Sequence, residues 1–88
     1  MENKIALISI MICREDTVEN VNALLHEYRM HIIGRMGIPR PERGLSLISV
    51  ALDAPQDVIN ALTGKLGALS GVAAKTVMQK TDECLVNL

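Results

Sequence analysis

Three arginines are the residues best suited to bind a ligand: Arg35, Arg40 and Arg43 lie in the stretch HIIGRMGIPRPERGLSLISV, residues 31–50. A guanidinium group binds carboxylates and phosphates through paired hydrogen bonds. Glu42 is the only acid in this stretch, so three arginines less one glutamate leave a local charge of +2, on a chain whose formal net charge is -1. Gathered from several subunits, these arginines would hold an anionic ligand or an acidic protein partner.

The same stretch contains Pro39 and Pro41, together with Gly37 and Gly44. Proline stiffens the backbone and removes an N–H donor, whereas glycine allows turn conformations that other residues avoid. These residues predict the turn of a central hairpin. They do not indicate a glycine-rich loop that cradles phosphate with its backbone.

Two histidines and a cysteine, His26, His31 and Cys13, are the candidate metal ligands. Imidazole and thiolate groups ligate zinc and related metals, but so few ligands complete a site only if a partner subunit supplies more. The alternative interpretation places His26 at the negative C-terminal end of a helix and His31 at an exposed strand start. In that interpretation Cys13 is a small buried residue at a strand end. The cofactor is therefore unknown, with a metal as one candidate.

Motifs for catalysis or for binding nucleic acid are not found in the sequence. It contains no Ser-His-Asp pattern and no phosphate loop with a Lys-Ser or Lys-Thr pair. The glycines of GKLGALSG, residues 64–71, follow a predicted helix instead of opening one, which is typical of a helix end and turn. Tyr28 is the only aromatic residue, so the predicted strands offer no rings on which bases stack. We expect a protein that is not an enzyme.

Composition predicts one domain with an aliphatic core, since the 88 residues are 49% hydrophobic and include no Phe or Trp. The mixed charges exclude a strongly basic nucleic-acid binder. The opening MENKIALISIMIC does not predict a signal peptide, because Arg14, Glu15 and Asp16 follow where small cleavage-site residues belong. Its apolar run is also shorter than the ~20 residues of a membrane span. With Cys13 and Cys84 as the only cysteines, we expect a cytoplasmic protein with free thiols and no membrane partner.

Hydrophobic periodicity predicts the element order β-α-β-β-α-β, which is the order of a ferredoxin-like sandwich. VNALLHEY at 21–28 also echoes INALTGKL at 59–66, in equivalent positions of the two halves. We expect an α+β fold with a four-stranded antiparallel sheet and both helices on one face, in a single domain over residues 1–80 followed by a tail at 81–88. The expected elements are strands at 5–12, 31–37, 45–52 and 72–79, and helices at 15–29 and from Asp53–Pro55 to about 69.

Both faces of the first and third predicted strands are apolar. In the first, Ile5, Leu7 and Met11 alternate with residues that are also apolar. An open antiparallel sheet normally alternates apolar with polar residues, because one face meets water. We therefore expect a second subunit to cover the helix-free face, giving a homo-oligomer that is a dimer or a dimer of dimers.

The segments LLHEY, IIGRMGIPRPERGLSLISV, ALTGKLGALSGV and KTV together resemble the family of small proteins proposed to regulate iron-only hydrogenase systems. The resemblance covers roughly residues 3–78, and GRMGIP, ERG and LTGKLG are its most specific pieces. It implies an ACT-like fold akin to the C-terminal nickel-binding domain of the nickel-responsive repressor. It also implies an anaerobic host that makes an iron-only hydrogenase, and a regulatory role without a reaction.

Two differences from that repressor limit what the resemblance carries over. The first predicted strand begins by about Lys4, so we expect no DNA-binding ribbon-helix-helix in this chain. GIPRPERGLSLISV contains no His or Cys, so of the repressor's nickel ligands only His31 has a counterpart. We expect an oligomeric regulatory module that senses a small ligand or metal at a subunit interface. The alternative is a ligand-free interaction or scaffold subunit associated with hydrogenase maturation.

Overall fold

The computed structural model describes residues 2–80, and the tail expected at 81–88, with Cys84, lies outside the described residues. Four strands and two α-helices follow the predicted order, with three short 3-10 turns between them. The strands are β1 (Asn3–Ile12), β2 (Ile32–Arg40), β3 (Leu45–Pro55) and β4 (Val72–Met78); the helices are α1 (Val18–Glu27) and α2 (Gln56–Gly67). The 3-10 turns are η1 (Glu15–Thr17), η2 (Arg29–His31) and η3 (Pro41–Arg43).

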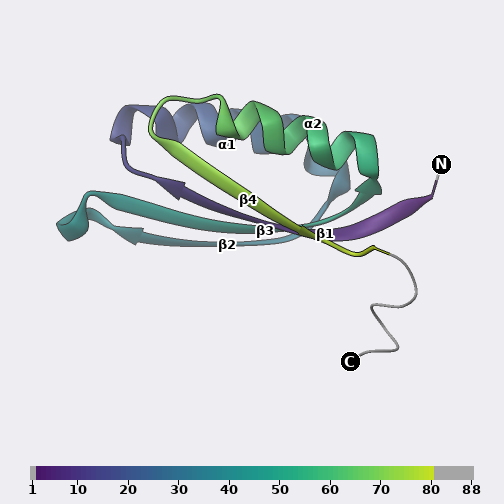
Figure 1. Cartoon of the computed structure of the whole chain (residues 1–88). Coiled ribbons are helices and arrows are strands. Elements are labelled where there is room, and N and C mark those ends of the chain that lie inside the picture. Colours follow the sequence, from purple (N-terminus) through teal and green to yellow (C-terminus); the bar gives the residue numbers. More distant parts are fainter. Residues whose placement is uncertain (1, 81–88) are drawn as a thin grey trace.

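The strands form one sheet in the order β2-β3-β1-β4, and all neighbouring strands are antiparallel. Figure 1 shows both helices on the same side of this sheet, which leaves the opposite side without a helical layer. The predicted ferredoxin-like α+β sandwich is therefore confirmed.

The core lies between the sheet and the helices. Every second residue of β1, from Ala6 to Ile12, is buried against the helices, as are the matching positions of β3. Burying one aliphatic side chain fully stabilises the fold by roughly 1.5–3 kcal/mol. Ile5, Leu7, Ser9 and Met11 alternate with the buried residues of β1 and are exposed, so in the single chain only one of the two apolar faces of β1 is buried. The large buried side chains are Ile8, Ile12, Val21, Leu25, Val50, Leu52, Ile59, Leu62 and Leu66.

The central hairpin begins its turn later than the sequence predicts. β2 continues through Pro39 to Arg40 instead of ending at Gly37. Because β2 is an edge strand, it tolerates a proline without loss of the sheet. Gly37 has an ordinary strand conformation, whereas Gly44 adopts the left-handed conformation, with φ of 66°. The turn therefore depends on Gly44 and not on Gly37.

Two helix starts also differ from the prediction. β3 runs to Pro55 because Asp53 pairs with Ile5 of β1, so α2 begins only at Gln56. Thr17 does not cap α1; its buried hydroxyl donates a hydrogen bond to the Ser70 carbonyl oxygen at 2.9 Å. The first helical turn is consequently the 3-10 turn η1.

Arg14 connects the loop after β1 to the loop before β4. Its guanidinium donates hydrogen bonds to Ser70 Oγ at 3.0 Å and to both carboxylate oxygens of Asp16, at 3.1 and 2.7 Å. The Cys13 amide donates to the Gly71 carbonyl oxygen at 2.9 Å. Gly71 itself has a φ of 73°, and a Cβ added there would lie 2.6 Å from Arg14 Cγ. Only glycine fits without strain at position 71, where the Arg14 side chain passes close to the backbone.

We predict that Gly71→Ala lowers the free energy of unfolding by about 1–3 kcal/mol, because it adds a left-handed alanine and a clash with Arg14. Gly64→Ala is the matched control: it lies within α2 and a Cβ there meets nothing within 4 Å. The control should be neutral or stabilising by about 0.5–1 kcal/mol. Urea denaturation measures both, and equal stability of the two variants would contradict the prediction.

The ion pair between Arg14 and Asp16 predicts a pH dependence of stability. The hydrogen bond from Arg14 holds the pKa of Asp16 below its ordinary value. The contribution of this carboxylate is therefore fully present above the unfolded pKa of about 3.9 and is lost as the pH falls through the lower folded pKa. Thermal melts between pH 5 and about pH 2 should show a smaller loss of Tm for Asp16→Asn than for the wild type. The effect is small because both groups are exposed, and parallel curves would contradict it.

Candidate functional site

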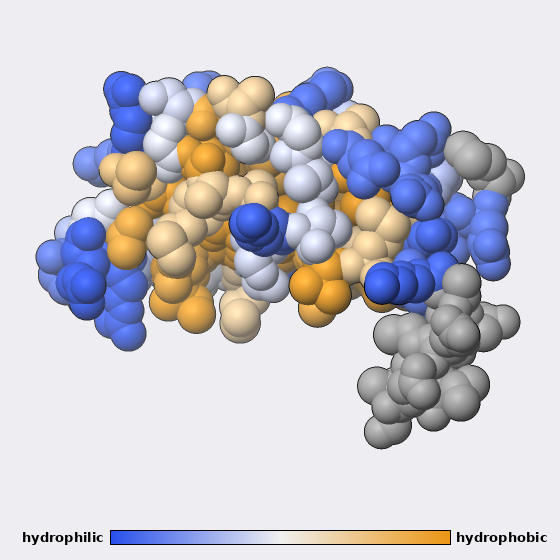
Figure 2. Space-filling view, viewed as in Figure 1, coloured by the Kyte–Doolittle hydropathy of each residue, from blue (hydrophilic) through white to orange (hydrophobic). Residues whose placement is uncertain are grey.

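The helix-free face of the sheet is the largest functional candidate, and it is apolar. Ile5, Leu7 and Met11 of β1 point to this side and remain 44–48% exposed. Figure 2 shows apolar side chains along the side of the sheet opposite the helices. Exposed apolar residues gathered on one face are typical of interaction surfaces. Other exposed apolar residues in the outer strands are Ile33, Met36, Ile38 and Val77.

From Leu7 to Met11, the strand register sets three rows that run across the open face of the sheet. Leu47 and Ala73 flank Met11, and Ala51 and Val77 flank Leu7. Between these apolar rows lies a polar row, in which Ser9 is opposite Ser49 on one side and Lys75 on the other. Two small hydroxyl side chains, Ser9 and Ser49, thus lie at the middle of the face.

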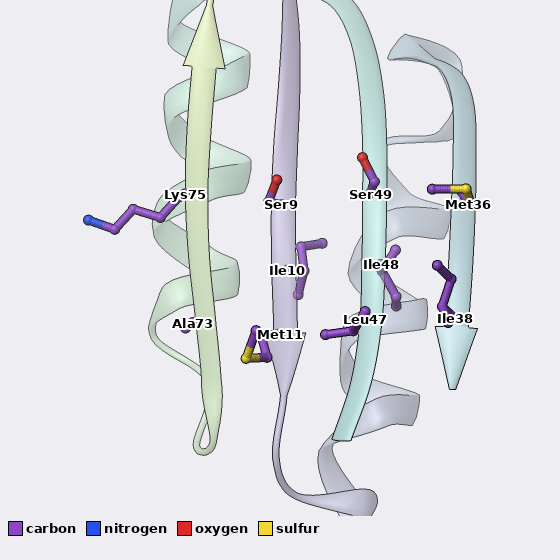
Figure 3. A pocket seen from close by; sticks show the side chains of 10 residues that line it. All are labelled: Ser9, Ile10, Met11, Met36, Ile38, Leu47, Ile48, Ser49, Ala73 and Lys75. Carbon is purple, nitrogen blue, oxygen red and sulfur yellow. The ribbon is translucent and has the colours of Figure 1, made fainter. Parts of the chain in front are cut away.

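A hollow of about 360 Å³ lies over this middle row. Figure 3 shows the side chains around it, with the Lys75 amine directed outward past the edge strand β4. No carboxylate, imidazole or thiol lines the hollow, so its lining offers apolar contact, two hydroxyl groups and the amine of Lys75. The lining residues are Ser9, Ile10, Met11, Met36, Ile38, Leu47, Ile48, Ser49, Ala73 and Lys75.

A second hollow, of about 980 Å³, lies at the end of the sheet between the loop after β1 and the central hairpin. Cys13, Pro39 and Pro41 are among its lining residues. Its arginine, Arg14, is already neutralised by Asp16, and the pair raises the pKa of Arg14 as well as lowering that of Asp16. Glu15 and Glu19 also line this hollow without an ion pair in the described residues, so the hollow is acidic and does not suit an anion.

The three predicted anion-binding arginines do not form one cluster in a single protomer. Arg35 is opposite Val50, whose side chain is buried under the helices, and it donates to Asn22 Oδ1 of α1 at 2.8 Å. Arg40 is an odd number of residues further along β2, so it points to the other face, where it pairs with Glu42 at 3.4 Å. Arg43 is exposed in η3. Convergence of these side chains from several subunits stays a prediction.

The candidate metal ligands are likewise separated. Cys13 precedes α1 while His26 lies at the far end of that ten-residue helix, a length of roughly 15 Å. The Cys13 thiol is exposed, which corrects the expectation that it is buried. His31 is half-buried at the end of η2. Within residues 2–80, no three His, Cys, Asp or Glu side chains lie close enough to hold a metal, so a site across subunits stays a prediction.

Sequence reasoning missed Arg29, which shares a small hollow with His26 and Arg35. The signal was present: Asn22, His26 and Arg29 follow helical spacing along one side of α1. Helical spacing does not reveal that the edge strand β2 brings Arg35 to the same hollow, because the hydrogen bond between Arg35 and Asn22 joins residues 13 apart in sequence.

The described part of the chain contains no helix that is long and apolar enough to cross a bilayer.

Comparison with solved structures places the chain beside the uncharacterized protein TM1266 from Thermotoga maritima, with 39% identity and a TM-score of 0.85 over 90% of this chain and 100% of that one. A search of curated proteins finds no match.

Two more distant structures share the fold alone. The C-terminal domain of the MgtC protein from Mycobacterium tuberculosis has a TM-score of 0.69 at 14% identity, covering 88% of each chain. A formyltetrahydrofolate deformylase from Pseudomonas putida has a TM-score of 0.58 at 20% identity, covering 96% of this chain and 35% of that one.

Residues 4–76 match the TM1266-like family, whose description is "Iron-only hydrogenase system regulator, putative". The match spans nearly all of the sheet and both helices. The resemblance predicted from the sequence is therefore confirmed, and the chain belongs to the TM1266-like family of iron-only hydrogenase system regulators.

Proposed function

We propose that this chain is a non-catalytic regulatory protein of an iron-only hydrogenase system that works as a homo-oligomer assembled through the helix-free face of the sheet. The observation that carries the proposal is the apolar character of that face, where Leu7 is 48% exposed and Val77 is 72% exposed. Covering these side chains with protein removes apolar surface from water, which favours association by roughly 25 cal/mol per Å² buried.

The dimensions of the face suit a protein partner. Four strands about 4.8 Å apart, with about nine residues each at about 3.4 Å per residue, span roughly 20 by 30 Å. A stable interface of standard size buries about 800 Å² of accessible surface on each partner. The face, about 600 Å² in projection, thus lies at the lower end of the range of about 600–1,000 Å² per partner that stable interfaces bury.

A second copy of the chain is the partner that suits this face. An isologous interface brings the same patch of both subunits together. Met11 and Leu47 lie directly beside the hollow over Ser9 and Ser49, so apolar contacts between the two copies would surround the hollow. Lys75 lies on the edge strand β4, and its side chain extends outward past that strand (Figure 3), so its amine can stay in water. A second copy can therefore cover the face without burying an unpaired charge at its centre.

The non-catalytic part of the proposal rests on the family's description as a regulator and on the lining of the open-face hollow. A hydrolytic or transfer site needs a nucleophile beside a base. Ser9, Ser49 and Lys75 supply the nucleophile types in that lining, no histidine or carboxylate accompanies them, and the Lys75 amine points outward past β4 (Figure 3).

The sensing part of the proposal places a small ligand at the subunit interface. A copy packed over the open face would enclose the hollow, whose walls are thioether and aliphatic groups such as Met11, Met36 and Ile38. This lining favours a small apolar molecule over a metal ion, and it favours a sensor over a ligand-free scaffold. The regulatory signal would then be a ligand-dependent change in association.

We predict that light scattering at low micromolar concentration gives a mass at least twice the 9.6 kDa of one chain. Leu7→Glu should yield a monomer, because it places a charge in the buried middle of the interface. The variant should keep its circular dichroism spectrum, since Leu7 does not contribute to the core under the helices.

Met30→Glu is the matched control for that experiment. Met30 is 85% exposed in η2, outside the sheet, and its substitution should leave the oligomer intact. A wild-type monomer, or equal dissociation of both variants, would contradict assembly through the open face.

For the regulatory role, deleting the gene in the organism that encodes this chain should change the level of iron-only hydrogenase activity or transcript. Wild type should restore the level, and Leu7→Glu should not, because regulation requires the assembled form. Unchanged hydrogenase activity and transcript in the deletion strain would refute the regulatory role, whatever the oligomeric state.

A further inference from the structure

The arginines of this chain differ in how their charge is balanced. Arg14 and Arg40 each form an ion pair with a nearby carboxylate, Asp16 and Glu42. Among the residues that the structure describes, Arg29 and Arg35 have no carboxylate within ion-pairing distance. Their positive charges are therefore uncompensated, on a chain that is slightly acidic overall.

These two arginines line the same hollow, a space of about 320 Å³ between α1 and the edge strand β2. His26 and Asn22 form its α1 side, and no acid contributes to the lining. Leu25 and Ile32 also line the hollow, adding apolar surface. The hollow thus combines two guanidinium groups and an imidazole around a partly apolar surface.

Neighbouring groups orient both arginines. Arg35 donates one hydrogen bond to Asn22 Oδ1 at 2.8 Å, and Arg29 donates one to the His26 carbonyl oxygen at 2.9 Å. A guanidinium has five N–H donors, so each arginine keeps most of its donors for a ligand. Fixing one arm of each side chain reduces the conformational entropy that binding would cost.

We propose that this hollow binds a small dianionic oxyanion, with a phosphate group as the best match. Two guanidiniums carry two positive charges, and a phosphate monoester carries a charge of about −1.5 to −2 at pH 7. The planar fork of arginine bonds phosphate oxygens in pairs. The His26 ring supplies a further N–H donor. This site is distinct from the open sheet face, so it stands independently of the oligomer proposed above.

The test is an NMR titration of the full-length protein with inorganic phosphate, with sulfate and succinate in parallel, at constant ionic strength set by chloride. Saturable amide shifts should be confined to residues 22–35. If the site recognises a tetrahedral oxyanion, phosphate and sulfate should both cause these amide shifts. A stronger response to succinate than to phosphate would overturn the choice of phosphate.

Arg29→Ala combined with Arg35→Ala should weaken phosphate binding by at least tenfold, while Lys80→Ala is the control for a positive charge removed elsewhere. Lys80 is exposed, forms no ion pair among the described residues, and follows β4, outside the hollow. The control should bind as the wild type does. The proposal fails if phosphate causes no saturable shift, if the double variant binds like the wild type, or if Lys80→Ala weakens binding equally.

Discussion

A four-stranded sheet has two faces, and in this chain the helices can cover only one of them. β1 lies second from the edge of the sheet and alternates strictly, with Ile8, Ile10 and Ile12 packed beneath α1 and α2. The intervening residues Leu7 and Met11 are equally apolar but face away from the helices. The helical layer stabilises the single chain, and the apolar second face is the surface through which we propose that a second copy binds.

The fold was predictable because this alternation and the helical spacing are properties of short segments. The strand at 5–12 and the apolar stripe through Val21 and Leu25 each specify their element without knowledge of the rest of the chain. Element ends were less predictable, because they depend on tertiary pairing. Asp53 reads as a helix start in the sequence, yet its backbone pairs with Ile5 and extends β3.

The candidate sites were predictable only in part, for a similar reason. Arg35, Arg40 and Arg43 are close in sequence, but strand alternation sends Arg35 and Arg40 to opposite faces of β2. Arg35 instead joins Arg29 and His26, which a chain reversal brings to the same hollow. The sequence thus identified arginine as the residue type of interest. Which arginines lie together depends on the register of the edge strand β2, which the sequence does not reveal.

The solvent accessibility of the methionine methyl groups tests the central claim most directly. Met11 and Met36 line the open-face hollow, whereas Met30 lies outside the sheet and is highly exposed. With methyl-labelled methionine and a soluble paramagnetic probe, NMR should show strong relaxation of the Met30 methyl and protection of those of Met11 and Met36. Relaxation of all three methyls to the same extent would mean that no second copy covers the face.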